Sequence, residues 1–259
     1  MTNKINYGDI FQVGPHRIAN CDARDEKIIR TLVGGDRIKV LLVDPPYAIQ
    51  ANQARESLIQ TNNRHKDIIN DQFQSDEEYA EFTKSWLETI RPHLEKKNAC
   101  YIFNSDKMIF SLRQAIIDSG YKFSQLLIWV KSHAVIGRLN YLPQHELIAY
   151  CWFGTHEFKK SQDKSVLFYP RPSKSRIHPT MKPIPLLRNL ILNSSSIGDV
   201  IFDGFLGSGQ SALAAEQTKR ICYGCELDPD YCRIILDRVA KATGLKMTKI
   251  IEGGKNEKS

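Results

Sequence analysis

Short apolar runs alternate along the chain with segments in which apolar residues recur every three to four positions. The runs predict strands at 9–13, 16–19, 39–43, 99–103, 123–130, 147–152, 221–225 and directly before Asp203. The helical spacing predicts helices at 24–33, 106–118, 185–196, 210–218 and 229–243, and one more that begins at 75–78. This alternation predicts an α/β protein with a mostly parallel sheet and helices on both faces.

Three segments depart from this rhythm. Residues 48–72 are polar and weakly periodic, and a loop of this length predicts a lid or a substrate-contacting loop, with a disordered insertion as the alternative. Residues 153–182 interleave lysines and arginines with aromatic residues, which favours a nucleic-acid surface over a solvated loop. The polar tail from Ile250 to Ser259 is expected to fray.

Composition narrows the class of protein only a little. The 259 residues fit one large α/β domain or two small ones, and 42% hydrophobic with 25% charged residues is ordinary for a soluble protein. The net charge of +7 is compatible with a polyanionic partner without requiring one. No run reaches membrane-spanning length and the N-terminus lacks a signal-peptide core, so we expect a cytoplasmic protein and no membrane partner.

The six cysteines mostly lie in or beside apolar runs, which predicts buried, reduced thiols. Cys222 and Cys225 have the spacing of a zinc ligand pair, but no second pair follows at a suitable distance, so no metal is expected.

The first candidate for chemistry is Asp44-Pro45-Pro46-Tyr47, directly after the apolar run Val40–Val43. Two prolines cannot continue a strand, so the strand ends in a rigid turn. Ligands of open α/β sheets bind outside the carboxyl ends of strands. A carboxylate and the Pro45 carbonyl can accept the two N–H bonds of an exocyclic amine while Tyr47 stacks on the ring. The alternative is a turn whose Asp44 only caps the local backbone.

The second candidate is a glycine-containing turn after the predicted strand that ends at Asp203. Phe205, Gly207 and Gly209 lie between that strand and a helix, and the next strand ends at Glu226. Glycines let a ligand approach the backbone, and an acid at the next strand end can hold ribose hydroxyls. The three-glycine dinucleotide pattern is absent, so the turn predicts a nucleotide-like cofactor without specifying it.

Together the two blocks resemble the amino-group DNA methyltransferases that use S-adenosylmethionine, in the β-class order that places Asp-Pro-Pro-Tyr first. The resemblance extends from about residue 8 to about residue 239 and includes the runs 178–183 and 144–146. It implies a single methyltransferase domain over 1–259, with a Rossmann-like, doubly wound, mostly parallel seven-stranded sheet and a circularly permuted motif order. Gly204 stands where the family has proline, which puts the local backbone in doubt.

The resemblance also implies roles for single residues. The target-base site is then Asp44, Pro45, Pro46 and Tyr47. The S-adenosylmethionine site is then Asp22, Thr180, Lys182, Asp203, Phe205, Gly207, Gly209 and Glu226. Residues 131–182 are expected to form a DNA-recognition insertion, with contacts from Lys131, Arg138, Asn140, Gln144, Arg171 and Lys174.

The reaction implied by the resemblance is methylation of the N6 amino group of adenine in double-stranded DNA, as in restriction–modification. The target base must leave the duplex, and Tyr47 would be its stacking platform. Asp at the first position of the motif favours adenine by family analogy, and N4 of cytosine remains open because both amines offer the same donors. Methylation of RNA or protein glutamine, and a DNA-binding protein with an inactive site, are further alternatives. Similar enzymes also form homodimers, and the sequence leaves the oligomeric state open.

Overall fold

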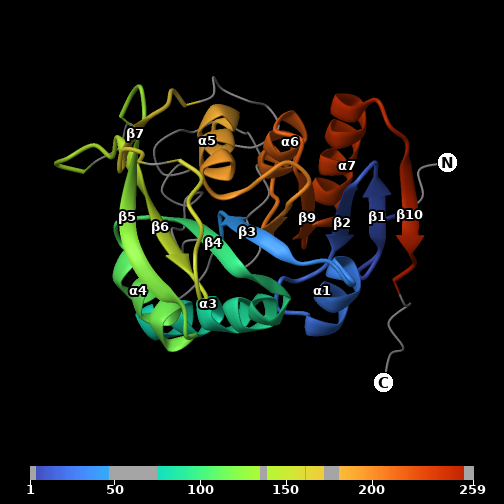
Figure 1. The fold of residues 1–259 in the computed structure, drawn as a ribbon, viewed down its shortest axis with the longest axis horizontal. Helices are drawn as coiled ribbons and strands as arrows, with labels where there is room; N and C mark the ends of the chain where they lie inside the picture. Colours follow the sequence, from blue (N-terminus) through green and yellow to red (C-terminus); the bar gives the residue numbers. More distant parts are fainter. Residues whose placement is uncertain (1–3, 47–74, 135–138, 161, 172–180, 254–259) are drawn as a thin grey trace.

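The computed structural model describes residues 4–46, 75–134, 139–160, 162–171 and 181–253 (Figure 1). Ten strands in these residues form one sheet. The strands are β1 (Ile10–Val13), β2 (His16–Asn20), β3 (Ile38–Val43), β4 (Leu94–Asn104), β5 (Lys122–Val130), β6 (His145–Trp152), β7 (Val166–Phe168), β8 (Val200–Asp203), β9 (Ile221–Glu226) and β10 (Met247–Ile251). All the predicted strands are present.

The sheet order is β10-β1-β2-β9-β8-β3-β4-β6-β5-β7. Five neighbouring pairs are parallel and four are antiparallel. The α/β class and the doubly wound arrangement are therefore confirmed, and the expected seven strands become ten in a mixed sheet. The two strands that were not predicted, β7 and β10, lie at the two edges of the sheet. Their apolar patterns are weak, and pairing with a neighbouring strand stabilises them.

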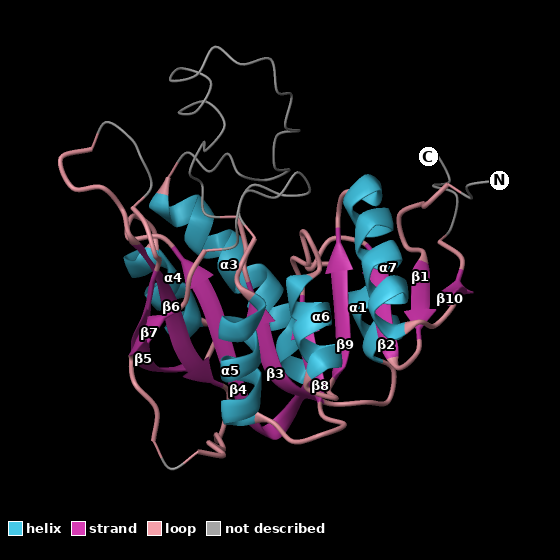
Figure 2. Ribbon diagram, turned by 90° about the horizontal axis from the view of Figure 1, so that it is seen from above, coloured by secondary structure: helices cyan, strands magenta, loops and turns pink. Residues whose placement is uncertain are grey.

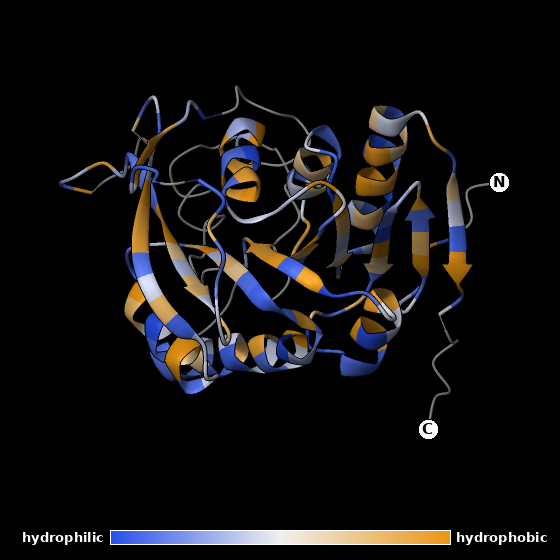
Figure 3. Cartoon of the chain, viewed as in Figure 1, coloured by the Kyte–Doolittle hydropathy of each residue, from blue (hydrophilic) through white to orange (hydrophobic). Residues whose placement is uncertain are grey.

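Helices cover both faces of the sheet, as predicted. One face carries α5 (Ile184–Ser194), α6 (Gln210–Gln217) and α7 (Pro229–Thr243), and the other carries α1 (Glu26–Val33), α3 (Asp76–Ile90) and α4 (Ile109–Asp118) (Figure 1). A short 3₁₀ turn, η1 (Arg91–His93), joins α3 to β4. Each face has its own apolar core, and Figure 3 shows the helices with hydrophobic and hydrophilic positions alternating along them.

Local sequence explains where several helices begin. The side chain of Ser75 accepts a hydrogen bond from the Glu78 amide at the start of α3, and Asp228 accepts from the Asp230 and Tyr231 amides at the start of α7. These side chains satisfy amide groups that have no partner within the helix. Among the described residues no helix is both long and apolar enough to cross a membrane.

The expected fraying of the tail is wrong for its first two residues. Ile250 and Ile251 belong to β10, which pairs antiparallel with β1. The buried carboxylate of Asp9 holds this strand: it accepts from Lys249 Nζ at 2.7 Å and from the Gly253 amide at 2.9 Å. The strand is thus stabilised by partners near the other end of the chain.

Candidate active site

Acidic residues gather at one edge of the sheet because the central strands run parallel. β2, β9, β8, β3 and β4 all point the same way, and Figure 2 shows this edge uppermost, with the arrowhead of β9. Asp203 ends β8, Glu226 ends β9 and Asp44 directly follows β3. The two sequence blocks, whose residues Asp44 and Asp203 are 159 positions apart, are therefore brought to the same edge, as the strand-end argument predicts.

Asp44 has a close cationic partner from the segment before α5. Lys182 Nζ donates to Asp44 Oδ2 at 2.5 Å. The Lys182 side chain is 6% exposed and the Asp44 side chain is 28% exposed, so the pair is largely shielded on the lysine side and more open on the carboxylate side. The residue expected at the cofactor's methionine end thus directly contacts the acid expected at the target base.

The charge pairs continue beyond Lys182 into β6 and the end of β5. Lys182 Nζ lies 3.1 Å from Glu146 Oε2, and Lys131 Nζ lies 2.9 Å from Glu146 Oε1. Burial favours a lower pKa for Lys182, but Asp44 and Glu146 outweigh it and the pKa is raised. Burial favours a higher pKa for Glu146, but Lys182 and Lys131 outweigh it and the pKa is lowered. Lys182 and Glu146 are therefore ionised at neutral pH, and acidic and basic side chains alternate from Asp44 through Lys182 and Glu146 to Lys131.

The glycine turn after β8 depends on the absence of side chains. Gly209 is the N-cap of α6 with φ +75°, and a Cβ there would lie 3.0 Å from Ile235 Cγ2. Asp203 Oδ1 accepts from the Phe205 amide at 2.9 Å, and Oδ2 accepts from Ser211 Oγ. Burial raises the pKa of Asp203 to about 7, although these hydrogen bonds favour its charged form. Gly204, at the family's proline position, packs tightly: a Cβ there would lie 3.0 Å from Ala23 Cβ.

Glu226 lies against the glycine turn. Its Oε2 accepts from the Gly207 amide at 2.8 Å and its Oε1 from the Asp228 amide at 2.9 Å. Burial raises the pKa of Glu226 to about 7 despite both hydrogen bonds. A buried acid beside a glycine turn has the chemistry needed to hold vicinal hydroxyls.

Asp22, the other candidate acid, follows β2 and is paired within its own turn. Arg24 Nη2 donates to Asp22 Oδ2 at 2.6 Å and Arg24 Nε donates to Oδ1 at 3.0 Å. Burial favours a higher pKa for Asp22, but these bonds with Arg24 outweigh it and the pKa is lowered. The carboxylate is therefore charged and held in one orientation.

Aromatic rings from α3 complete this side of the site. The Phe205 ring lies edge-on to the Trp86 ring, with centroids 5.6 Å apart, and 6.0 Å from Phe82. Trp86 is fully buried, and among the residues that the structure describes its Nε1 has no hydrogen-bond partner. Sequence reasoning missed Phe82 and Trp86 as part of the site because both are spaced as ordinary core positions of a helix.

The predicted DNA contacts divide into three groups. Arg138, Lys174 and the loop 48–72 lie outside the described residues, as do Tyr47 of the target-base site and Thr180 of the predicted cofactor site. Asn140 and Gln144 are exposed on the β5–β6 connection and Arg171 follows β7, all toward the edge that holds Asp44. Gln144 also closes the base of its loop, since its side chain donates to the Lys131 carbonyl at 3.1 Å. Lys131 differs from the others, because its ammonium group is directed inward onto Glu146 and is 7% exposed.

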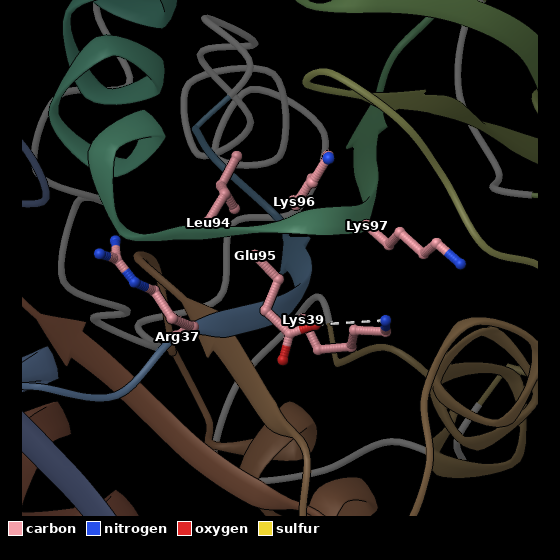
Figure 4. Close-up of a pocket in the computed structure, with 6 residues that line it drawn as sticks. All are labelled: Arg37, Lys39, Leu94, Glu95, Lys96 and Lys97. Atoms are coloured by element: carbon pink, nitrogen blue, oxygen red, sulfur yellow. Dashed lines mark hydrogen bonds and ion pairs between the residues drawn. The ribbon is translucent and has the colours of Figure 1, made fainter.

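Part of the basic segment lies at the opposite edge of the sheet. β6 is antiparallel to β4, so the residues after Trp152 return to the amino ends of β3 and β4. There Glu157 pairs with Lys39 at 3.0 Å and with Lys159 at 2.9 Å. A hollow of about 720 Å³ lies at this same edge, lined by Arg37, Lys39, Leu94, Glu95, Lys96 and Lys97 (Figure 4). It is remote from Asp44 and belongs to no part of the candidate site.

Comparisons with known proteins agree with this arrangement. A profile of the DNA methylase family N6_N4_Mtase matches residues 38–237. The Type II methyltransferase M2.DpnII of Streptococcus pneumoniae is 25% identical, over 92% of this chain and 96% of that protein. The Type II methyltransferase M1.MboII of Moraxella bovis is 21% identical, over 75% of this chain and 86% of that protein.

Two solved structures share the fold. The cytosine-N4-specific PvuII DNA methyltransferase superposes with a TM-score of 0.70 at 15% identity, covering 92% of this chain and 94% of that one. The M1.HpyAVI–SAM complex superposes with a TM-score of 0.65 at 19% identity, covering 88% of this chain and 98% of that one. At these identities the likeness concerns the arrangement of strands and helices.

Proposed function

The chain belongs to the DNA methylase family that groups N6 and N4 amino methyltransferases, and on this premise we propose that it transfers a methyl group from S-adenosylmethionine to the N6 amino group of adenine in DNA. The observation that carries the proposal is the placement of Asp44 beside the buried turn formed by Asp203, Gly207 and Glu226. Asp44 can accept hydrogen bonds from an amine, and it shares one edge of the sheet with a turn of the nucleotide-binding type. Methyl transfer between two bound molecules requires such proximity.

The residues at the glycine turn fit S-adenosylmethionine. Gly209 has φ +75° and lets the turn pack directly against Ile235, the Glu226 carboxyl can accept from ribose hydroxyls, and the buried Trp86 Nε1 is a donor without a partner among the described residues. We propose that these groups and Phe205 hold the cofactor, with Asp22 near its adenine. The cofactor, when bound, supplies an electrophilic methyl group on a sulfonium.

Asp44 and the Pro45 carbonyl would hold the target amine. An exocyclic amine is a weak nucleophile because its lone pair is delocalised into the ring. Two acceptors that accept hydrogen bonds from its N–H groups draw the nitrogen toward tetrahedral geometry. Its lone pair is then directed away from the ring. A carboxylate has several acceptor positions, so Asp44 can accept a hydrogen bond from Lys182 and another from the amine. Most of the acceleration then comes from positioning and electrostatics.

The choice of adenine rests on Asp44 as the first residue of the motif, by analogy with the family. The second candidate is N4 of cytosine, which is supported by the shared fold of the cytosine-N4-specific PvuII enzyme. Both bases present the same amine to Asp44 and the Pro45 carbonyl. The base itself therefore has to be identified by experiment.

We further propose that double-stranded DNA lies along the edge that carries Asp44, with Asn140, Gln144 and Arg171 among the contacts. Within 131–182 only the parts near this edge then contribute to DNA recognition, and the part around Glu157 does not. The target base would be flipped out of the duplex and stacked on Tyr47.

The test is methyl transfer from labelled S-adenosylmethionine to mixed bacterial DNA, followed by nucleoside digestion and mass spectrometry. Wild type and Asp44→Ala are compared, with cofactor binding of both measured by calorimetry. N6-methyladenine from wild type alone, with cofactor bound by both proteins, is the expected result. Formation of N4-methylcytosine would contradict the choice of adenine. Cofactor binding without any label in DNA would contradict DNA as the substrate.

A further inference from the structure

Glu146 is a partly buried carboxylate, 21% exposed, with no role in the function proposed above. It lies in β6, opposite Trp129 of β5 in the antiparallel pairing, so a sheet fixes its backbone. Its two carboxylate oxygens face two different lysines: Oε1 lies 2.9 Å from Lys131 Nζ and Oε2 lies 3.1 Å from Lys182 Nζ. Both ammonium groups are almost fully buried, at 7% and 6% exposure.

Lys182 requires such a fixed partner. It precedes α5, which begins at Ile184, so its backbone lies in a connecting segment, where the Gln210 side chain of α6 donates to the Lys182 carbonyl at 3.2 Å. Its side chain is a flexible four-carbon stem that carries a compact charge. The described residues around the ammonium include Asp44 Oδ2 at 2.5 Å, Glu146 Oε2 at 3.1 Å and the face of the Phe103 ring at 5.1 Å. Of the two carboxylates, Asp44 follows its strand in a loop and Glu146 lies within one.

We propose that Glu146 is a positioning residue for methyl transfer, which holds Lys182 so that Lys182 in turn fixes the orientation of the Asp44 carboxylate. The inference rests on the proposed role of Asp44. In this arrangement Lys131 holds Glu146 in place from its other oxygen, so the cluster pairs two acidic with two basic side chains. The acceptor carboxylate would then be preorganised before the target amine arrives.

A similar arrangement at the other edge of the sheet provides a matched control. Glu157 also bridges two lysines, with Lys39 Nζ at 3.0 Å and Lys159 Nζ at 2.9 Å. This cluster lies at the amino ends of β3 and β4, far from Asp44. The same substitution there removes a carboxylate between two lysines without touching the candidate site.

The experiment compares wild type, Glu146→Gln, Glu157→Gln, Lys131→Met and the double variant Glu146→Gln/Lys131→Met. Single-turnover rates of methyl transfer to DNA are measured beside Kd for S-adenosylmethionine and for DNA. We expect Glu146→Gln to lower the rate about 100-fold, the cost typical of a misplaced reacting group, while each Kd stays within about threefold. Glu157→Gln should keep the wild-type rate. The double variant should be as slow as Glu146→Gln, since both substitutions act through one residue.

Several results would overturn the inference. A rate for Glu146→Gln within threefold of wild type would do so, and so would a parallel loss of rate and cofactor affinity, which indicates a structural role only. Recovery of the rate in the double variant would show that the loss came from the unpaired charge of Lys131. If wild type itself does not methylate DNA, the proposed function fails instead, and that outcome is distinguishable.

Discussion

Lys182 Nζ and Asp44 Oδ2 lie 2.5 Å apart, although the two residues are separated by 138 positions in the chain. The contact ties the segment before α5 to the turn after β3. It therefore links the residues proposed to bind the cofactor with those proposed to bind the target base. Removal of the lysine from this contact has a consequence that can be measured directly.

Removal of the Lys182 charge should impair catalysis more than cofactor binding. We expect Lys182→Met to lower the methyl-transfer rate at least about 100-fold, because Asp44 loses the group that orients it. The control is Lys39→Met, which also removes a buried lysine between two carboxylates, Glu95 and Glu157, but at the opposite edge. Equal loss of activity in both variants would mean that the effect is one of folding and not of the site.

Cofactor affinity should increase with pH through the titration of Glu226. Burial raises its pKa to about 7, so the carboxyl is mostly protonated at pH 6 and mostly ionised at pH 8. The ionised form is the better acceptor for ribose hydroxyls, so binding releases a proton below pH 7. Kd for S-adenosylmethionine should fall by up to about tenfold per pH unit below 7 and level off above it.

Calorimetric titrations at several pH values can check this dependence in wild type and Glu226→Gln. The variant should bind more weakly, with a flatter profile across pH 7. An unchanged slope in Glu226→Gln would assign the pH dependence to another group.

Gly224 of β9 should be among the least replaceable glycines for stability. A Cβ there would lie 2.4 Å from the Asp203 carbonyl oxygen and 2.9 Å from Leu206 Cγ. Gly224→Ala must therefore separate β9 from β8, which we expect to lower the free energy of unfolding by about 1–3 kcal/mol or more. Gly35→Ala is the control, since a Cβ at Gly35 meets no atom within 4 Å. Denaturant midpoints of the two variants give the comparison, and equal midpoints would contradict the expected clash.

Arg171 should contribute to DNA affinity through a phosphate contact. We expect Arg171→Ala to weaken DNA binding and to reduce the slope of log K against log salt by about one. The control is Lys164→Ala, because Lys164 lies just before β7, on the side opposite to the carboxyl ends of the central strands. Fluorescence anisotropy at several salt concentrations measures both slopes. A larger loss for Lys164→Ala would place the DNA on the other edge.

The strands and helices of the fold follow from patterns that act locally. The apolar run before Asp44 predicts β3, and the capping residue Ser75 predicts the start of α3. The structure contains both elements. β10 escaped prediction because Met247–Ile251 includes Thr248 and Lys249, and its order comes from pairing with β1 and from Asp9, far away in the chain.

The candidate site was predictable as a set of strand ends but not as a set of contacts. That Asp44, Asp203 and Glu226 share one edge follows from parallel strands. The ion pairs of Lys182 with Glu146, and of Glu146 with Lys131, join three separate segments and leave no mark in residue spacing. The antiparallel direction of β6, which carries Lys159 away from the site, depends equally on tertiary pairing.

The order of strands in the sheet also constrains synthesis on the ribosome. The hairpin formed by β1 and β2 is synthesised before the other strands of the sheet, yet its neighbours in the sheet are β9 and β10, which follow all the others. β2 pairs with β9 across about 206 positions, as Asn20 opposite Glu226 shows. The growing chain must therefore keep β1 and β2 without these partners until β9 and β10 have been synthesised. Nascent chains that stop before Ile221 should then expose the first hairpin to proteases and chaperones.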